Sequence, residues 1–220
     1  MSNRLAVLAA VAVLASSQAM ADEAPGAAVD WGVVTGRTVG SHNFVIHPEF
    51  GWPGIGSGFI YGAGDAFDVG GRFTFNYGSE LATVIAPEIK MTGLLKFKLL
   101  DRDKFSMAIS TEPGIGFIFV GGGAGMVIFF PAYLSFGIHP APQVGIVLGA
   151  DLPFQIGFSF NGGGVVFGLP MGFGPGVEFA IAPNLQLTFN MRFGPGIVAA
   201  GGGAGAGFAF KTLMGIAIKL

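Results

Sequence analysis

The residues best suited to do chemistry in this chain are its three histidines, because it has no cysteine. They are His42, His47 and His139, and only His47 has an acid close by, Glu49 two positions later. Residues two positions apart on a strand lie on the same face. Any polar strand face contains such pairs, so this pair by itself does not indicate a site. No further metal ligand and no serine at a suitable turn accompany the pair. The sequence therefore predicts no catalytic residue, no metal site and no cofactor, and we do not expect an enzyme.

Most other ionisable residues alternate with apolar ones. Over the nine residues 185–193, every odd position is apolar and every even position is polar. The stretches 68–77 and 85–99 divide in the same way. This period of two is typical of β-strands with one apolar and one polar face.

The composition indicates lipid rather than water around the apolar face. Hydrophobic residues make up 51% of the chain and charged residues 11%, with a mean hydropathy of +0.66. Two stretches without Asp, Glu, Lys or Arg, 114–143 and 155–177, resemble membrane helices by hydropathy, but both contain glycine clusters and prolines. Inside a helix, each glycine costs about 1 kcal/mol and each proline about 3. Strands are therefore the better interpretation.

Strands in lipid must close on themselves, because an open sheet edge leaves backbone groups unpaired. We therefore predict an all-β fold: a closed antiparallel transmembrane β-barrel of about ten strands, with eight or twelve as alternatives. The expected strands lie near residues 42–50, 54–63, 67–78, 84–99, 104–119, 126–138, 143–160, 165–181, 184–198 and 206–220.

The N-terminus predicts export. Arg4 precedes an apolar run, and the small residues Ala19 and Ala21 form a cleavage motif. The predicted organisation is a signal peptide at 1–21, an N-terminal periplasmic segment at 22–41 and a transmembrane β-barrel at 42–220. A net charge of −2 argues against nucleic acid as a partner.

Short turns with charge or proline are expected at 64–68, 101–104, 139–142 and 182–184, and glycine-rich loops at 121–125, 161–164 and 199–207. Together with the export signal, the alternating strands and an apolar last strand at 208–220, this pattern resembles the small outer-membrane β-barrel proteins of Gram-negative bacteria. In that family the last residue is usually aromatic, whereas here it is Leu220. The resemblance implies location in the outer membrane, with lipid, lipopolysaccharide and the barrel-assembly machinery as partners.

If the apolar side chains face lipid, the charged strand residues face the lumen, where they should pair with one another. The predicted lumen network consists of Glu49, Arg72, Glu88, Lys90, Glu112, Asp151, Glu178, Arg192 and Lys211. A recurring Pro-Gly-aliphatic unit predicts strand bulges, since proline removes a ladder hydrogen bond. These bulges are expected at Pro113, Gly114, Pro175, Gly176, Pro195 and Gly196.

Three functions remain open at this point. The first is a structural or narrow-channel, porin-like barrel with a charge-paired lumen. The second is a transporter or binder of hydrophobic small molecules or lipids, because the half of the lumen near the glycine-rich loops carries little charge. The third is a scaffold that docks a partner protein through its apolar outer loops.

Overall fold

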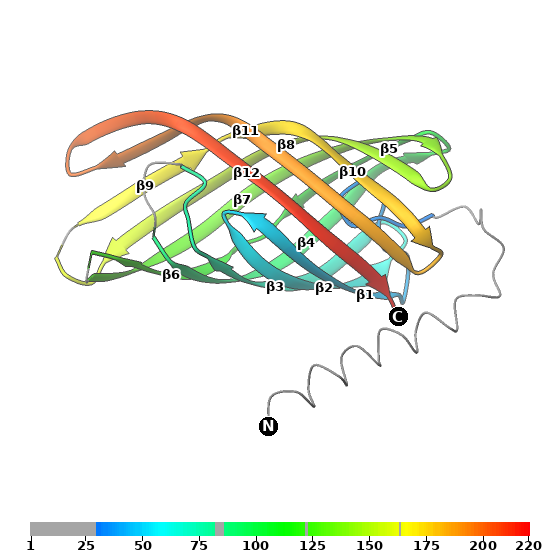
Figure 1. The fold of residues 1–220 in the computed structure, drawn as a ribbon, viewed down its shortest axis with the longest axis horizontal. Helices are drawn as coiled ribbons and strands as arrows, with labels where there is room; N and C mark the ends of the chain where they lie inside the picture. Colours follow the sequence, from blue (N-terminus) through cyan, green and yellow to red (C-terminus); the bar gives the residue numbers. More distant parts are fainter. Residues whose placement is uncertain (1–29, 82–85, 122, 163) are drawn as a thin grey trace, which may run out of the picture.

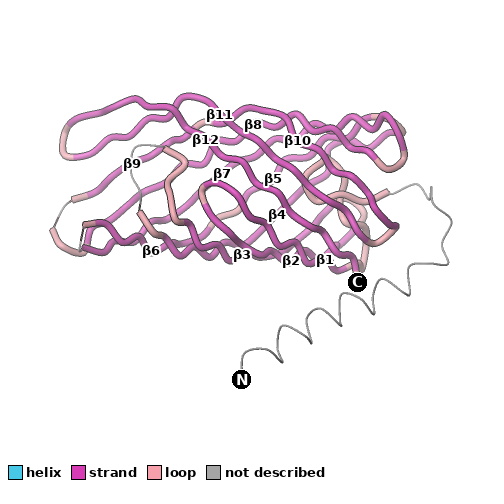
Figure 2. The backbone as a smooth tube through the Cα atoms, viewed as in Figure 1, coloured by secondary structure: helices cyan, strands magenta, loops and turns pink. Residues whose placement is uncertain are grey.

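A computed structural model of the chain describes residues 30–81, 86–121, 123–162 and 164–220. The predicted signal peptide, 1–21, and the first part of the predicted periplasmic segment, 22–29, lie outside the described residues. Within the described part all regular structure is β-strand (Figure 2). No helix in that part is long and apolar enough to cross a membrane.

Twelve strands form one antiparallel sheet. The strands are β1 (Phe44–Trp52), β2 (Gly54–Gly64), β3 (Phe67–Asn76), β4 (Glu88–Arg102), β5 (Phe105–Thr111), β6 (Gly114–Val120), β7 (Gly123–Ala141), β8 (Val144–Ser159), β9 (Val165–Pro170), β10 (Gly172–Ala182), β11 (Leu185–Ala200) and β12 (Gly203–Lys219).

The strand pairings close into a ring of ten (Figure 1). The ring runs β1-β2-β3-β4-β5-β7-β8-β10-β11-β12, and β12 pairs with β1 to complete it. The other two strands extend members of the ring: β6 continues β5 between β4 and β7, and β9 precedes β10 between β8 and β11. The sequence predicted one strand at 104–119 and one at 165–181. The structure divides the first at Glu112 and Pro113 and the second at Met171.

The Pro-Gly units do not produce the predicted bulges, and that prediction is wrong. The register of β4 is the same against β5, where Leu95 faces Thr111, and against β6, where Thr92 faces Gly114. The ladder between β11 and β12 also runs without a shift, as does the ladder between β8 and β10. These ladders contain the predicted positions Pro175, Gly176, Pro195 and Gly196. Proline removes one donor without adding a residue, so the ladder is interrupted and keeps its register.

Register shifts occur instead beside the four tight turns. They lie at residues 62–64 in β2, 98–100 in β4, 138–141 in β7 and 180–182 in β10. The turns themselves, at 65–66, 103–104, 142–143 and 183–184, fall where the sequence predicted them. All four lie at the same end of the ring as the C-terminus (Figure 1).

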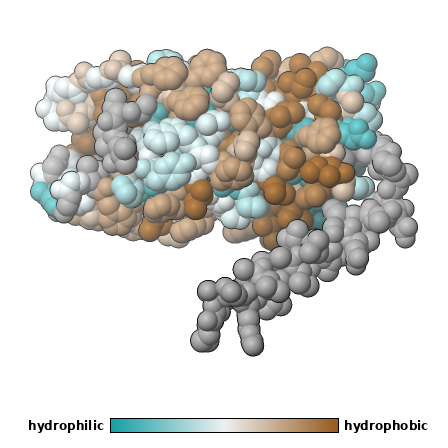
Figure 3. Space-filling model, in the orientation of Figure 1, coloured by the Kyte–Doolittle hydropathy of each residue, from teal (hydrophilic) through white to brown (hydrophobic). Residues whose placement is uncertain are grey.

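The two faces of the ring differ in the way that the alternation requires. Outward side chains are large and apolar, with Phe73 53% and Phe130 54% exposed. Many inward side chains are polar and buried, with Asp68 fully buried and Arg192 4% exposed. On the face seen in Figure 3, apolar surface is densest over the half of the ring nearer the C-terminus, with hydrophilic residues at the turns of that end.

Residues 30–41, which we term the inner segment, lie within this turn-bearing end of the ring as a loop (Figures 1 and 2). Trp31 and Val39 are almost completely buried there. They belong to an apolar cluster with Val45, Ile60, Leu94, Ala180 and Ala217 from the surrounding strands. These residues belong to the stretch 22–41 that the sequence predicts as a periplasmic segment, and they are not part of any strand.

The inner segment lies close to β2, so two nearby glycines of that strand should differ in how well they tolerate substitution by alanine. A Cβ at Gly62 would collide with the carbonyl oxygen of Gly40, whereas a Cβ at Gly64 would meet nothing within 4 Å. Gly62→Ala should therefore lower the free energy of unfolding by roughly 1–3 kcal/mol, as overpacking does. Gly64→Ala should have little effect. Thermal unfolding in detergent, followed by circular dichroism, measures both, and equal effects would contradict the contact.

Candidate functional site

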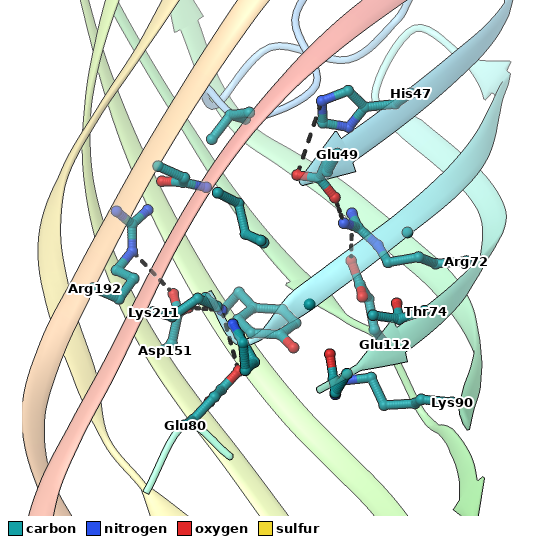
Figure 4. A pocket seen from close by; sticks show the side chains of 18 of the residues that line it. His47, Glu49, Arg72, Thr74, Glu80, Lys90, Glu112, Asp151, Arg192 and Lys211 are labelled. Carbon is teal, nitrogen blue, oxygen red and sulfur yellow. Dashed lines mark hydrogen bonds and ion pairs between the residues drawn. The ribbon is translucent and has the colours of Figure 1, made fainter. Parts of the chain in front are cut away.

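The inner face of the ring surrounds a polar cavity of about 130 Å³. A water molecule needs about 10–15 Å³ of such space, so the cavity has room for several. Its lining is rich in charged side chains of both signs, several of which Figure 4 labels. Most of them come from strands, so their positions are fixed by the ladder, whereas Glu80 and Glu112 lie between strands. Most ionisable groups on its walls fall into two clusters.

The first cluster, the Arg72 cluster, holds two carboxylates on one guanidinium. Arg72 on β3 forms ion pairs with Glu49 on β1 and with Glu112 between β5 and β6, the latter at 3.2 Å. His47 Nε2 lies 3.9 Å from Glu49 and 2.9 Å from the hydroxyl of Thr188. Without His47, the cluster carries one more negative than positive charge.

The second cluster, the Asp151 cluster, holds two cations on one carboxylate (Figure 4). Asp151 on β8 accepts from Arg192 Nε on β11 at 3.2 Å and from Lys211 Nζ on β12 at 2.7 Å. Lys211 also lies 3.9 Å from Glu80 and 5.5 Å from the centre of the Tyr133 ring.

Glu80 was not among the predicted network residues. It follows β3 and reaches the Asp151 cluster because its backbone oxygen accepts from Phe210 of β12. The signal in the sequence was an acidic residue in the connection Gly78-Ser79-Glu80, since the glycine-rich loops at 121–125, 161–164 and 199–207 carry no charge.

Three of the predicted network residues, Glu88, Lys90 and Glu178, lie outside both clusters. Glu88 accepts a hydrogen bond from the amide of Asn76 at 2.6 Å. Lys90 Nζ lies 4.7 Å from the centre of the Phe129 ring, a cation–π arrangement. The predicted single network is therefore two separate clusters with additional local pairs.

Glu178 serves a different purpose from the other carboxylates. Its Oε1 accepts hydrogen bonds from three consecutive backbone amides of the inner segment, those of Val33, Val34 and Thr35. The bonds from Val33 and Thr35 measure 2.7 and 3.2 Å. A carboxylate held by several backbone amides is a strong, charge-assisted arrangement. Glu178 therefore binds the inner segment to β10.

Other buried polar side chains hold the inner segment from the remaining sides. Lys96 Nζ donates to the carbonyl oxygens of Gly32 and Val33, each at 3.2 Å. The Asp68 carboxylate accepts from the amide of Val39 at 3.2 Å. Alternation in the sequence places Asp68 and Lys96 on polar strand faces, but it does not reveal that their partners are backbone groups of the inner segment.

The inner segment separates the polar cavity from a second, smaller one of about 10 Å³. Val33 and Val34 line the large cavity, whereas Trp31 and Arg37 line the small one on the turn-bearing side. Glu178 also lines the small cavity. The segment is thus a partition across the interior of the ring.

Ser106 Oγ lies 2.9 Å from His139 Nε2, and Ser106 is fully buried. Among the described residues no three histidine, aspartate or glutamate side chains are placed to hold a metal ion. No protein-family model matches the chain, and a search of curated proteins likewise gave no match.

The Asp151 cluster predicts a large cost for losing its single carboxylate. Asp151→Ala leaves the buried Arg192 and the partly buried Lys211 without their shared partner, which should cost about 3–5 kcal/mol of unfolding free energy. Glu80→Ala, which removes a more exposed carboxylate 3.9 Å from Lys211, should cost about 0–1 kcal/mol. Denaturant unfolding in detergent measures both. Adding Lys211→Met to Asp151→Ala should restore part of the loss, and strictly additive effects would contradict the pairing.

Proposed function

We propose that this protein is an outer-membrane β-barrel whose ring spans the bilayer and whose interior is a narrow passage for small polar solutes and ions. The observation that carries the proposal is the opposition of faces: large apolar side chains cover the outside of the ring while charged side chains fill the inside. A ring in water would bury the apolar face, so lipid is the solvent that this arrangement fits.

Strand lengths support the proposal. The shortest unbroken members of the ring, β1 and β3, have 9 and 10 residues, and β7 has 19. A tilted strand of about 9–11 residues crosses the hydrocarbon layer. The ring therefore has sufficient height on every side, and its longer strands extend beyond the membrane.

The lining of the cavity favours polar over apolar solutes. The cavity is bordered by both ion clusters and by hydroxyl and amide groups, whereas sites for hydrophobic ligands are mainly apolar. Phe129, which the uncharged half of β7 directs inward, is 6% exposed and packs against Lys90 instead of lining a free space. The geometry thus supports the narrow passage better than a binder of lipids.

If the ring spans the bilayer, the free-energy cost of placing a charge on its outer face should depend on depth in the membrane. Phe73 lies within β3, well away from the tight turn, whereas Phe105 begins β5 directly after one, and both are exposed. Phe73→Arg should cost about 2–4 kcal/mol of folding free energy in bilayers and Phe105→Arg about 0–1, as expected for the midplane and the interface. Reversible unfolding from lipid vesicles measures the difference. Equal free-energy costs at the two positions would contradict a membrane span in which Phe73 lies near the midplane and Phe105 near the interface.

Passage of ions predicts a change of selectivity when the Arg72 cluster loses its cation. Arg72→Ala leaves the carboxylates of Glu49 and Glu112 without the guanidinium that they share, so the current should become more cation-selective. The control is Lys98→Ala, which removes a positive charge paired with Asp101 near a turn, outside the cavity. The measurement is the reversal potential in planar bilayers under a salt gradient. A complete absence of current, or equal reversal potentials in wild type and Arg72→Ala, would overturn the proposed passage.

A further inference from the structure

We propose that the inner segment, residues 30–41, is a releasable plug and that the Glu178 carboxylate is the latch that holds it in the ring. The inference rests on the proposed passage and identifies the element that closes it. The partition between the two cavities consists of this segment, so its departure would join the polar cavity to the turn-bearing end.

The ring does not need the inner segment for its own closure. The ladder between β1 and β12 begins at Val45, and every ring pairing is complete without residues 30–41. The segment closes on itself through a bond from the Gly32 amide to the Thr38 carbonyl oxygen, at 3.2 Å. It is therefore a small loop inserted into the ring rather than an eleventh strand.

The contacts that hold the segment are ones that water can replace. Its backbone is bound mainly by side chains of the wall, among them Glu178, Lys96 and Asp68, each nearly fully buried. Burying a charge is costly, so these three groups would recover hydration if the segment left. That recovery offsets much of the energy of the lost bonds.

Two polar atoms at the interface also have no hydrogen-bond partner within the described structure: the Thr35 hydroxyl and the Gln186 side-chain oxygen. Both would gain partners in water. The Trp31 ring and Val39 oppose release, because they leave the apolar cluster. Because these effects oppose one another, the strong interaction at Glu178 decides whether the inner segment stays in the ring.

Glu178 is suited to act as the latch because three amides depend on one oxygen. Glu178→Ala removes the acceptor for all of them. Glu178→Gln keeps an acceptor oxygen but not the charge, so its effect should be intermediate. Glu88→Ala is the matched control: it removes an inward glutamate that binds Asn76 and not the inner segment.

The position of the plug can be followed independently of conduction through Trp31. The chain has two tryptophans, so Trp52→Phe leaves Trp31 as the only one. In the full mature chain in lipid vesicles, acrylamide should quench Trp31 poorly, since it is 2% exposed. Glu178→Ala should raise both the quenching of Trp31 and the open probability in planar bilayers by about tenfold or more, because losing even one of the three hydrogen bonds to a charged group shifts an equilibrium by about that factor.

A reversible lock keeps the test independent of any folding defect in Glu178→Ala. A Cβ at Gly137 on β7 would lie 3.2 Å from the Thr35 Cβ, close to the separation found in disulfides, once the nearby Ser106 hydroxyl has rotated away. The chain has no cysteine of its own, so Thr35→Cys with Gly137→Cys gives one possible bridge. Oxidation should abolish the current, and reduction should restore it in the same sample. Gly137→Cys alone should not respond.

The results separate the two proposals. If the current is the same in the oxidised and reduced forms, or if Trp31 stays shielded in folded Glu178→Ala, the plug inference is overturned. If Trp31 becomes accessible in Glu178→Ala and the disulfide shields it again while no form conducts, the latch stands and the proposed passage is overturned. Parallel changes in quenching and current support both.

Discussion

Charge buried on the inner face is the constraint on which the rest of the structure depends. The alternation that covers the outside of the ring with apolar side chains directs the charged ones inward, where little water reaches them. Each such charge needs a partner, because an unpaired one costs several kcal/mol. The partners lie far apart in the chain, as with Asp151 on β8 and Arg192 on β11. The strand order of the sheet, in which β10 lies between β8 and β11, brings these two residues together.

The same requirement accounts for the inner segment. Glu178, Lys96 and Asp68 lie near one end of the ring, and all three bind backbone groups of residues 32–39. The segment is outside the sheet, so its amides and carbonyls lack ladder partners and need acceptors and donors. Buried charges and unpaired backbone groups therefore satisfy each other. This reciprocity places a loop inside a ring whose strands do not require it.

Preserved register is what keeps each side chain on its own face. A shift of one residue would turn every following side chain of a strand to the opposite face. The interruptions at Pro113 and Met171 keep the register, so the residues beyond them retain their orientation. The shifts that do occur lie beside the tight turns, where few residues remain before the strand ends. The strands can therefore contain prolines without exposing charge to the outer face.

The sequence by itself determined the strands, the tight turns and the direction of the side chains, because a period of two is a local property that nine consecutive residues such as 185–193 display in full. It also identified Glu49, Arg72, Glu112, Asp151, Arg192 and Lys211 as inward charges. Tertiary structure alone decided which of them pair, since register between distant strands sets those distances. It also decided the place of residues 30–41 and the role of Glu178, because a side chain that binds backbone amides 143–145 positions away leaves no local pattern.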